Sequence, residues 1–307
     1  MKTKLISLAI VTLILALVAV SCKKDTSPDS DGTSSTELSA QSDDEVMVSS
    51  ENDAISNDAE LILNTTTYVN GNSVPGICDA TFVVDLLSNP RTVTITYNGG
   101  SCNGRCTRTG KVIVSMPAGV QWKDAGAAIT VTFQNLKITR IRDGRSITLN
   151  GTQVHTNVSG GIVANLSSLQ TITHTITSDN MSIRFDNNSV RTWHIARKRV
   201  FTYSNGIVIT ITGTHTEGTA TGVAEWGTNR FGNTFTCAIT QPLVFKQDCS
   251  FRLTSGQITH IRPAVTTTTT FGLDASGNPT SCPGSGNYYF RLVWVTSTNT
   301  HTVIFPY

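Results

Sequence analysis

The chain has 307 residues, of which 38% are hydrophobic and 14% are charged, and its formal net charge is +2. It is rich in Thr, Val, Ile, Gly and Asn, whereas a helical bundle needs more Ala, Leu, Glu and Lys at helical spacing. A mean hydropathy of −0.03 and regularly recurring apolar residues exclude disorder over most of the chain. Length and composition therefore predict a β protein with a substantial core, in one large domain or two smaller ones.

The first residues have the order of a lipoprotein signal peptide. Lys2 and Lys4 form a basic region, residues 5–20 form an apolar stretch of 16 residues, and small residues precede Cys22. This order keeps the basic end in the cytoplasm, brings the apolar run into the translocon and gives the signal peptidase a small residue before an acylated cysteine. The alternative, an uncleaved membrane anchor, needs a longer apolar run. We expect residues 1–21 to be removed and lipid on Cys22 to hold the chain on a membrane.

Charge is divided unevenly along the mature chain. Residues 23–60 contain two lysines and eleven acidic residues, a balance of −9, while residues 61–307 contain 19 basic and 10 acidic residues, a balance of +9. Residues 22–60 are rich in Ser, Thr and Asp, and their composition predicts an acidic flexible tether. A weak apolar stripe over residues 51–63 indicates a short helix. Residues 61–307 form the predicted body.

From residue 77 onward the sequence predicts strands and turns. Turn pairs such as Asn-Gly and Asp-Gly supply the positive φ that hairpins need. The intervals between the strands contain no helical stretch long enough for parallel crossovers. The body is therefore predicted to be all-β, an antiparallel meander forming a sandwich or partial barrel. The predicted strands cover residues 92–97, 111–114, 129–133, 137–141, 147–149, 171–177, 200–203, 207–212, 234–240, 257–261, 266–271 and 289–295, and the turns cover 98–100, 143–144, 150–151, 187–188, 205–206 and 284–286.

Six cysteines remain after Cys22, and they indicate disulfides in an exported chain: Cys78, Cys102, Cys106, Cys237, Cys249 and Cys282. A zinc site is the alternative, but Cys102 and Cys106 have no second close pair and the histidines are scattered. We expect three disulfides and no structural metal. A faint internal repeat, Cys, strand, loop, Thr-rich strand, Gly-rich loop, Cys, predicts the pairs Cys78–Cys102 and Cys249–Cys282. It also indicates two related halves that meet near residues 160–180.

Several segments share a pattern: the Cys-Lys-Lys-Asp that follows the signal peptide, residues 78–102, 108–114, 147–152 and 236–244, and Cys249. Taken together, these segments resemble Thr-rich outer-membrane lipoproteins of Bacteroidetes-type bacteria. The similarity runs from about residue 75 to the end and rests on turns and strands rather than on catalytic signatures. It implies an outer-membrane or cell-surface lipoprotein and no particular activity.

Catalytic patterns are scarce in the sequence. Nucleophile elbows of the Gly-x-Ser-x-Gly type, phosphate loops and His-Glu-x-x-His are absent, and no cofactor is expected. Glu217 and Glu225 are a candidate glycosidase pair, because two carboxylates can supply the acid and the nucleophile or base, and Trp226 adjoins one of them. The alternative is that both are solvated acids near turns. The six histidines lie mostly between threonines on strands, where a polar outward face explains them.

One strand carries a pattern that favours binding. Alternation places Trp193, Arg197, Arg199 and Tyr203 on one face, and Arg140 and Arg142 repeat the spacing on an earlier strand. Guanidinium groups and flat rings suit phosphate or carboxylate polymers. The alternative is a half-buried strand with arginines that reach solvent only at their tips.

Two hypotheses about function follow. The first is a non-enzymatic, membrane-anchored lipoprotein with a structural or binding role, for which an anionic glycan or lipopolysaccharide is a candidate partner and nucleic acid is not expected. The second is a carbohydrate-active hydrolase that uses Glu217 and Glu225. The missing motifs favour the first.

Overall fold

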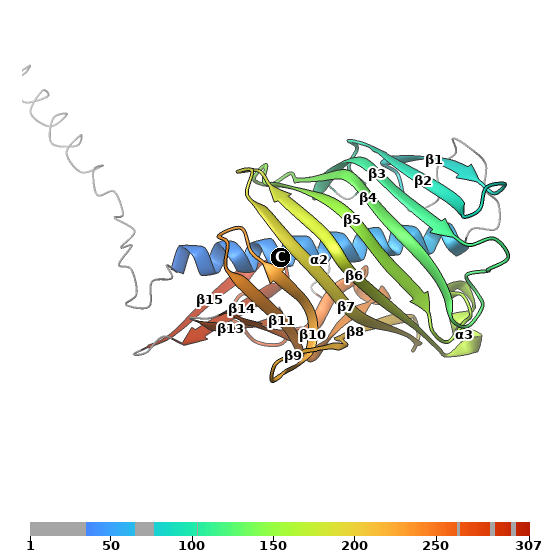
Figure 1. The fold of residues 1–307 in the computed structure, drawn as a ribbon. Helices are drawn as coiled ribbons and strands as arrows, with labels where there is room; N and C mark the ends of the chain where they lie inside the picture. The colour runs from blue at the N-terminus through green and yellow to red at the C-terminus, as the bar shows by residue number, and fades with distance from the viewer. Residues whose placement is uncertain (1–34, 65–76, 103, 263–264, 283–285, 296–298) are drawn as a thin grey trace, which may run out of the picture.

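The computed structural model describes residues 35–64, 77–102, 104–262, 265–282, 286–295 and 299–307. Within these ranges the chain forms one long helix, a short one and fifteen strands (Figure 1). The predicted all-β, antiparallel class is confirmed. The elements are α2 (Ser35–Asn64), β1 (Ala80–Asp85), β2 (Arg91–Asn98), β3 (Cys106–Met116), β4 (Ala127–Arg140), β5 (Ser146–Asn157), α3 (Leu166–Leu169), β6 (Thr171–Phe185), β7 (Val190–Tyr203), β8 (Ile207–Gly213), β9 (His215–Glu217), β10 (Ala220–Thr228), β11 (Thr234–Lys246), β12 (Arg252–Ile261), β13 (Thr266–Leu273), β14 (Tyr289–Val295) and β15 (Thr300–Pro306).

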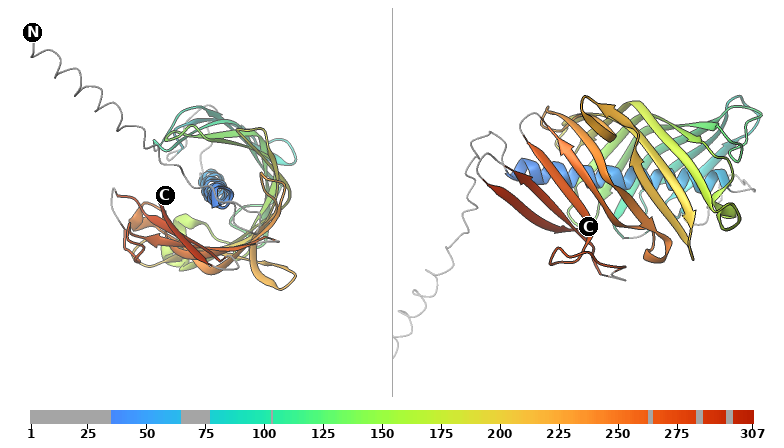
Figure 2. Two further views of the ribbon diagram at one scale, coloured as in Figure 1. Left: turned by 90° about the vertical axis from the view of Figure 1, so that its left-hand side faces the viewer. Right: turned by 90° about the horizontal axis from the view of Figure 1, so that it is seen from below.

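The described strands belong to a single antiparallel sheet. Their order follows the chain from β1 to β7, continues with β10 and ends at β15, while β8 pairs with β7 and β11, and β9 pairs with β10. This is a meander with one local excursion. The sheet curves around α2 in the end view (Figure 2, left), so that the predicted partial barrel describes it better than a sandwich. Because β5 pairs with β6 from Ile147 and Phe185 to Asn157 and His174, the sheet is continuous across residues 160–180.

Helix α2 runs along the concave face of the sheet (Figures 1 and 2). Its 30 residues include neither Gly nor Pro, but many are Ser, Asp or Asn, which are weak helix formers, so tertiary packing must supply much of its stability. Val48, Ile55 and Ile62 are fully buried in the same core as Ile95 and Val112 of the sheet. Among the described residues, no helix is both long enough and apolar enough to span a bilayer.

The structure differs from the predicted tether over residues 35–60, which belong to α2. Asp43, Asp53 and Asp58 of this segment meet arginines of the sheet, as described below, so these acids do not need water as their partner. The helix predicted over residues 51–63 lies inside α2 and is confirmed. The signal peptide, Cys22 and residues 23–34 lie outside the described part of the chain.

Two predicted breaks between strands are β-bulges instead. The strands predicted over 129–133 and 137–141 form one strand, β4, which shifts register between Phe133 and Leu136. The turn predicted at residues 150–151 lies within β5, where the pairing with β6 shifts register. Gly151 has φ +118°, and a Cβ there would lie 2.5 Å from the carbonyl oxygen of Asn180. Glycine is required at this bulge because the neighbouring backbone comes so close.

Candidate binding site on the concave face

Arginine side chains of the sheet and its turns meet α2 on the concave face. Strand alternation explains this arrangement in β7, where every second side chain from Arg191 to Phe201 is buried toward the helix. Guanidinium groups fit carboxylates through paired, charge-assisted hydrogen bonds. The arginines that contact residues of α2 are Arg108, Arg140, Arg142, Arg145, Arg191, Arg197, Arg199, Arg230 and Arg262.

The first part of the helix is held by Asp43 and Asp44. Arg140 donates to both oxygens of Asp43, at 2.9 and 2.8 Å, and Arg145 contacts Asp43 as well. Asp44 accepts hydrogen bonds from Arg145 at 2.8 Å and from Arg230 at 2.7 Å. Burial opposes ionisation of Asp43, but its arginines outweigh burial and lower its pKa. Burial dominates at Asp44 and raises its pKa to about 6, despite the arginines beside it.

The middle of the helix adjoins a buried network around Glu225 of β10. Arg197, whose exposed fraction is 1%, contacts Glu225 and donates to Asp53 of α2 at 3.1 Å. Trp193 Nε1 donates to Glu225 at 2.6 Å, and the hydroxyl of Ser49 donates to it at 2.7 Å. Burial raises the pKa of Asp53. At Glu225 burial acts in the same direction, but the charges of Arg197 and a second arginine lower the pKa below its usual value.

The last turns of the helix are tied to β1–β3 through Arg108. Its Nε and Nη2 donate to the two oxygens of Asp79 at 2.7 Å each, and its Nη1 donates to Asp58 of α2 at 2.6 Å. The hydroxyl of Tyr97 donates to Asp58 at 2.9 Å, and the guanidinium lies 4.4 Å from the ring centroid of Tyr97. The planar guanidinium of Arg108 is a binding site for carboxylates, and Asp58 of α2 in the same chain occupies part of it.

The predicted binding surface comprises Arg140, Arg142, Trp193, Arg197, Arg199 and Tyr203. The structure confirms that Trp193, Arg197 and Arg199 share one face, but all three are buried against α2, with exposed fractions of 0%, 1% and 3%. Arg140 and Arg142 contact Asp43, and Tyr203 at the end of β7 is exposed. The face was predicted to meet a partner from outside, and instead it meets the acidic segment of its own chain. The physical reason is charge complementarity within the molecule.

The structure does not bring Glu217 and Glu225 together as a glycosidase pair. Glu217 lies opposite Ala220 on the β9–β10 hairpin, and its carboxylate lies 3.1 Å from the ring of His215. Glu225 lies five residues beyond Ala220 along β10, which is roughly 16 Å at about 3.3 Å per residue. Glycosidase carboxylates lie about 5–9.5 Å apart. Glu217 is exposed, whereas Glu225 is fully buried.

The cysteine predictions are partly confirmed. Two disulfides, Cys78–Cys102 and Cys249–Cys282, are present as the repeat predicts. The prediction of a third disulfide is wrong, because Cys106 and Cys237 are both free thiols. They lie on β3 and β11, which are far apart in the strand order. Cys106 lies 3.6 Å from a carboxylate oxygen of Glu51.

A cavity of about 280 Å³ lies between α2 and strands β8, β11, β12 and β13. Its helix side includes Ala54 and Asn57, and three arginines, Arg105, Arg199 and Arg252, contribute positive charge to its lining. The apolar part of its wall comes from Ile209, Ile211, Leu243, Phe245, Leu253, Ile258 and Phe271. An apolar hollow with a few charged groups is the usual form of a small-molecule site.

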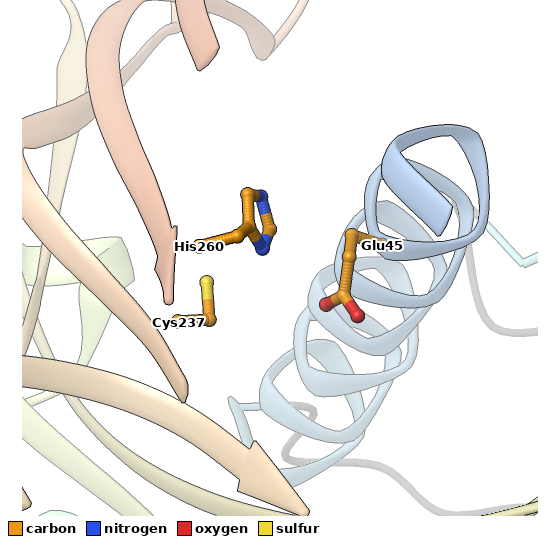
Figure 3. Close-up of side chains that lie close together, drawn as sticks. All are labelled: Glu45, Cys237 and His260. Carbon is orange, nitrogen blue, oxygen red and sulfur yellow. The ribbon is translucent and has the colours of Figure 1, made fainter. Parts of the chain in front are cut away.

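Glu45, Cys237 and His260 converge at one side of this cavity (Figure 3). All three are buried, and their ligand atoms lie within 4.8 Å of one another. Burial raises the pKa of Glu45 to about 7, lowers that of His260 to about 4 and raises that of the Cys237 thiol well above its usual value. Sequence analysis did not find this cluster. The available signal was that Cys106 and Cys237 fall outside the two pairs that the repeat predicts.

Comparison of the chain with models of protein families, with curated proteins and with solved structures finds no match. The resemblance to outer-membrane lipoproteins therefore stays a prediction from the sequence. The geometry of the concave face and of its cavity carries the functional argument.

Proposed function

We propose that this chain is an exported, lipid-anchored binding protein without enzymatic activity, and that its cavity holds a small, mainly apolar ligand with an acidic group. The cavity beside α2 is the observation that carries this proposal. Its volume of about 280 Å³ lies near the lower end of the range for ligand pockets, which suits a small molecule. The signal-peptide pattern before Cys22 supports a location at the outer membrane or cell surface.

The charges in the lining favour an acidic ligand. Arg199 donates to the amide oxygen of Asn57, and Arg252 donates to main-chain oxygens of Gly286 and Tyr307. The lining holds three arginines, Arg105, Arg199 and Arg252, against two acids. The two acids of the lining, Glu45 and Asp53, are paired with arginines that do not line the cavity. A carboxylate or phosphate that enters the cavity therefore gains charge-assisted hydrogen bonds.

This geometry narrows the partner predicted from the sequence. Because α2 covers most of the arginines on the concave face, an anionic glycan or lipopolysaccharide binds only if one of its acidic groups is small enough to enter the cavity. The packing of α2 against the sheet also changes how binding of an anionic polymer must be tested. A body that lacks residues 1–60 would lose most of α2 and with it Val48 and Ile55 of the core, so binding must be measured on a chain that keeps the helix.

Calorimetric titration with fatty acids of increasing length, each compared with the alcohol of equal length, tests the proposal. We expect the acids to bind more tightly than the alcohols, with an optimum at short length and weaker binding at high salt. Ala54→Trp fills the cavity from the helix and should abolish binding, whereas Leu61→Trp, at an exposed position of the same helix outside the lining, should leave it unchanged. Equal binding by the two variants would contradict this assignment of the site.

Lipid attachment has a separate test. Metabolic labelling with a fatty-acid analogue should label the wild-type chain and leave the Cys22→Ala variant unlabelled. A wild-type chain without label would remove the anchor from the proposal and leave the cavity as its remaining part.

A further inference from the structure

We infer that Glu45, Cys237 and His260 form a zinc site. The three side chains come from three elements, α2, β11 and β12, and their ligand atoms lie within 4.8 Å of one another (Figure 3). Cys237 and His260 face each other directly across two antiparallel strands. This pairing puts both side chains on the same face of the sheet, where Glu45 meets them from the helix.

Unpaired polar atoms point to an ion in this space. Nδ1 of His260 and Oε2 of Glu45 are buried without a hydrogen-bond partner, in residues whose exposed fractions are 4% and 3%. The other carboxylate oxygen of Glu45, Oε1, has Arg191 Nη2 as its ion-pair partner at 2.6 Å. Buried polar atoms without a partner are rare in folded proteins, and a bound ion is one of their recognised explanations.

The donor set indicates the metal. Thiolate, imidazole and carboxylate together are typical of zinc, whereas calcium and magnesium prefer oxygen ligands alone. Zinc–ligand bonds of about 2.0–2.3 Å place tetrahedral ligand atoms roughly 3.3–3.8 Å apart. The three atoms therefore need to draw together by at most about 1.5 Å, which rotation about the side-chain bonds of the three residues can supply.

Charge balance also allows a dication here. With the thiol ionised by the metal, Cys237 and Glu45 supply two negative charges against the two positive charges of zinc. Among the groups around them, Arg191 and Arg197 are cationic, and Arg262 adds its charge near His260. Two carboxylates offset part of this charge: Glu225 contacts Arg197 and has its Oε2 3.9 Å from Arg191 Nη2, and Asp53 accepts a hydrogen bond from Arg197. Arg191 would remain beside Glu45, where it can orient the ligating carboxylate.

The site leaves one coordination position for a ligand that is not a protein side chain. Three protein ligands and one open position are the arrangement of zinc sites that bind water or a substrate. Glu45, Cys237 and His260 all line the cavity, so the fourth position faces it. An acidic ligand in the cavity would reach the metal, and this last step rests on the binding function proposed above.

The other cluster of metal-ligand residues in the described part of the chain does not compete with this one. It consists of Asp248, Cys249 and Cys282, but the two cysteines form a disulfide and their sulfurs are not available as thiolates. The free thiol of Cys106 lies on β3, outside the cluster, and provides a matched control for Cys237.

Cobalt and zinc titrations of the chelator-treated, disulfide-intact chain test the inference without any organic ligand. We expect one Co²⁺ per chain with a thiolate-to-cobalt charge-transfer band in the near ultraviolet, and displacement of Co²⁺ by Zn²⁺. Cys237→Ala should remove the band, and Cys237→Ala and His260→Ala should each weaken zinc binding by at least tenfold. Cys106→Ala should change neither the band nor the zinc affinity.

A second measurement on the wild-type chain guards against variants that fail to fold. Zinc should slow alkylation of Cys237 in the native protein and leave Cys106 as reactive as before, as determined by mass spectrometry of the labelled peptides. A wild-type chain that shows no charge-transfer band, or equal zinc affinity in the Cys237→Ala and Cys106→Ala variants, would overturn the site. Such a result would leave the cavity proposal untouched, because fatty-acid binding is measured separately.

Discussion

Replacement of Arg197 tests whether α2 is docked through buried ion pairs. Arg197→Met removes a cation whose exposed fraction is 1% and which contacts Asp53 of the helix and Glu225 of the sheet. The variant leaves both carboxylates buried, and Glu225 keeps only its hydrogen bonds and the more distant Arg191. Loss of one partner of a buried ion pair typically costs about 3–5 kcal/mol. We expect a loss of stability in that range.

Arg142→Met is the matched control, because Arg142 also contacts an acid of α2. Its side chain is 53% exposed and lies 3.4 Å from Asp43, which keeps its contacts with two other arginines. Exposed ion pairs contribute about 0–1 kcal/mol, so this variant should lose less than about 1 kcal/mol. The residue type and the substitution are the same, so the difference between the two variants reports burial together with the loss of a direct partner for Asp53 and Glu225.

Urea unfolding followed by circular dichroism gives both free energies by linear extrapolation, and equal slopes would show that the unfolded states are comparable. A double-mutant cycle with Asp53→Asn separates the direct Arg197–Asp53 contact from the remaining loss. If Arg197→Met costs no more than Arg142→Met, the helix is not held by buried charges and the description of the concave face is incorrect.

Three further outcomes follow from other parts of the structure. Alkylation of the unfolded, unreduced chain should label Cys106 and Cys237 and none of the four disulfide cysteines; a fully unlabelled chain would restore the third disulfide. Ile55→Ala should cost about 2–5 kcal/mol, since Ile55 of α2 is fully buried, and a loss below about 1 kcal/mol would favour a detached segment. Burial lowers the folded-state pKa of His155 to about 3, so the unfolded state takes up a proton first as pH falls and stability is lost below about pH 6.5. This loss amounts to about 2 kcal/mol at pH 5 by the usual 1.4 kcal/mol per pKa unit, and His155→Asn should reduce the pH dependence between pH 7.5 and 5 by that amount, whereas an unchanged dependence would contradict the lowered pKa.

The strands could be predicted because their signal is local. Alternation of apolar and polar residues and the turn pairs between them locate most strands, and the side-chain period of two correctly places Trp193, Arg197 and Arg199 on one face. The same period does not say which face is buried when both carry polar groups. An arginine in a sequence is usually predicted to be exposed. Here several arginines are buried on the concave face, because carboxylates of the same chain pair with them.

The helix and the cluster beside it depend on contacts between distant residues. Asp53 and Arg197 are separated by 144 residues, and Glu45 lies far from Cys237 and His260 in the sequence. Composition alone describes residues 35–60 as a solvated acidic segment, because the weak helix formers and charges it contains cannot fold by themselves. The balance of −9 against +9 was a signal of mutual attraction between segments, although it does not say which pairs form.

The internal pairing of charge also limits what an external anion can do. The acidic helix is covalently attached to the sheet, so it competes for the arginines at an effective concentration of about millimolar or more. Asp43 accepts two hydrogen bonds from Arg140, and Arg108 binds both Asp58 and Asp79, so a polymer must displace already well-formed carboxylate contacts to reach these groups. At Arg252 a small acid in the cavity competes with main-chain oxygens of Gly286 and Tyr307 rather than with a side-chain carboxylate of α2. The same physics that conceals most of the basic face therefore directs recognition to the cavity.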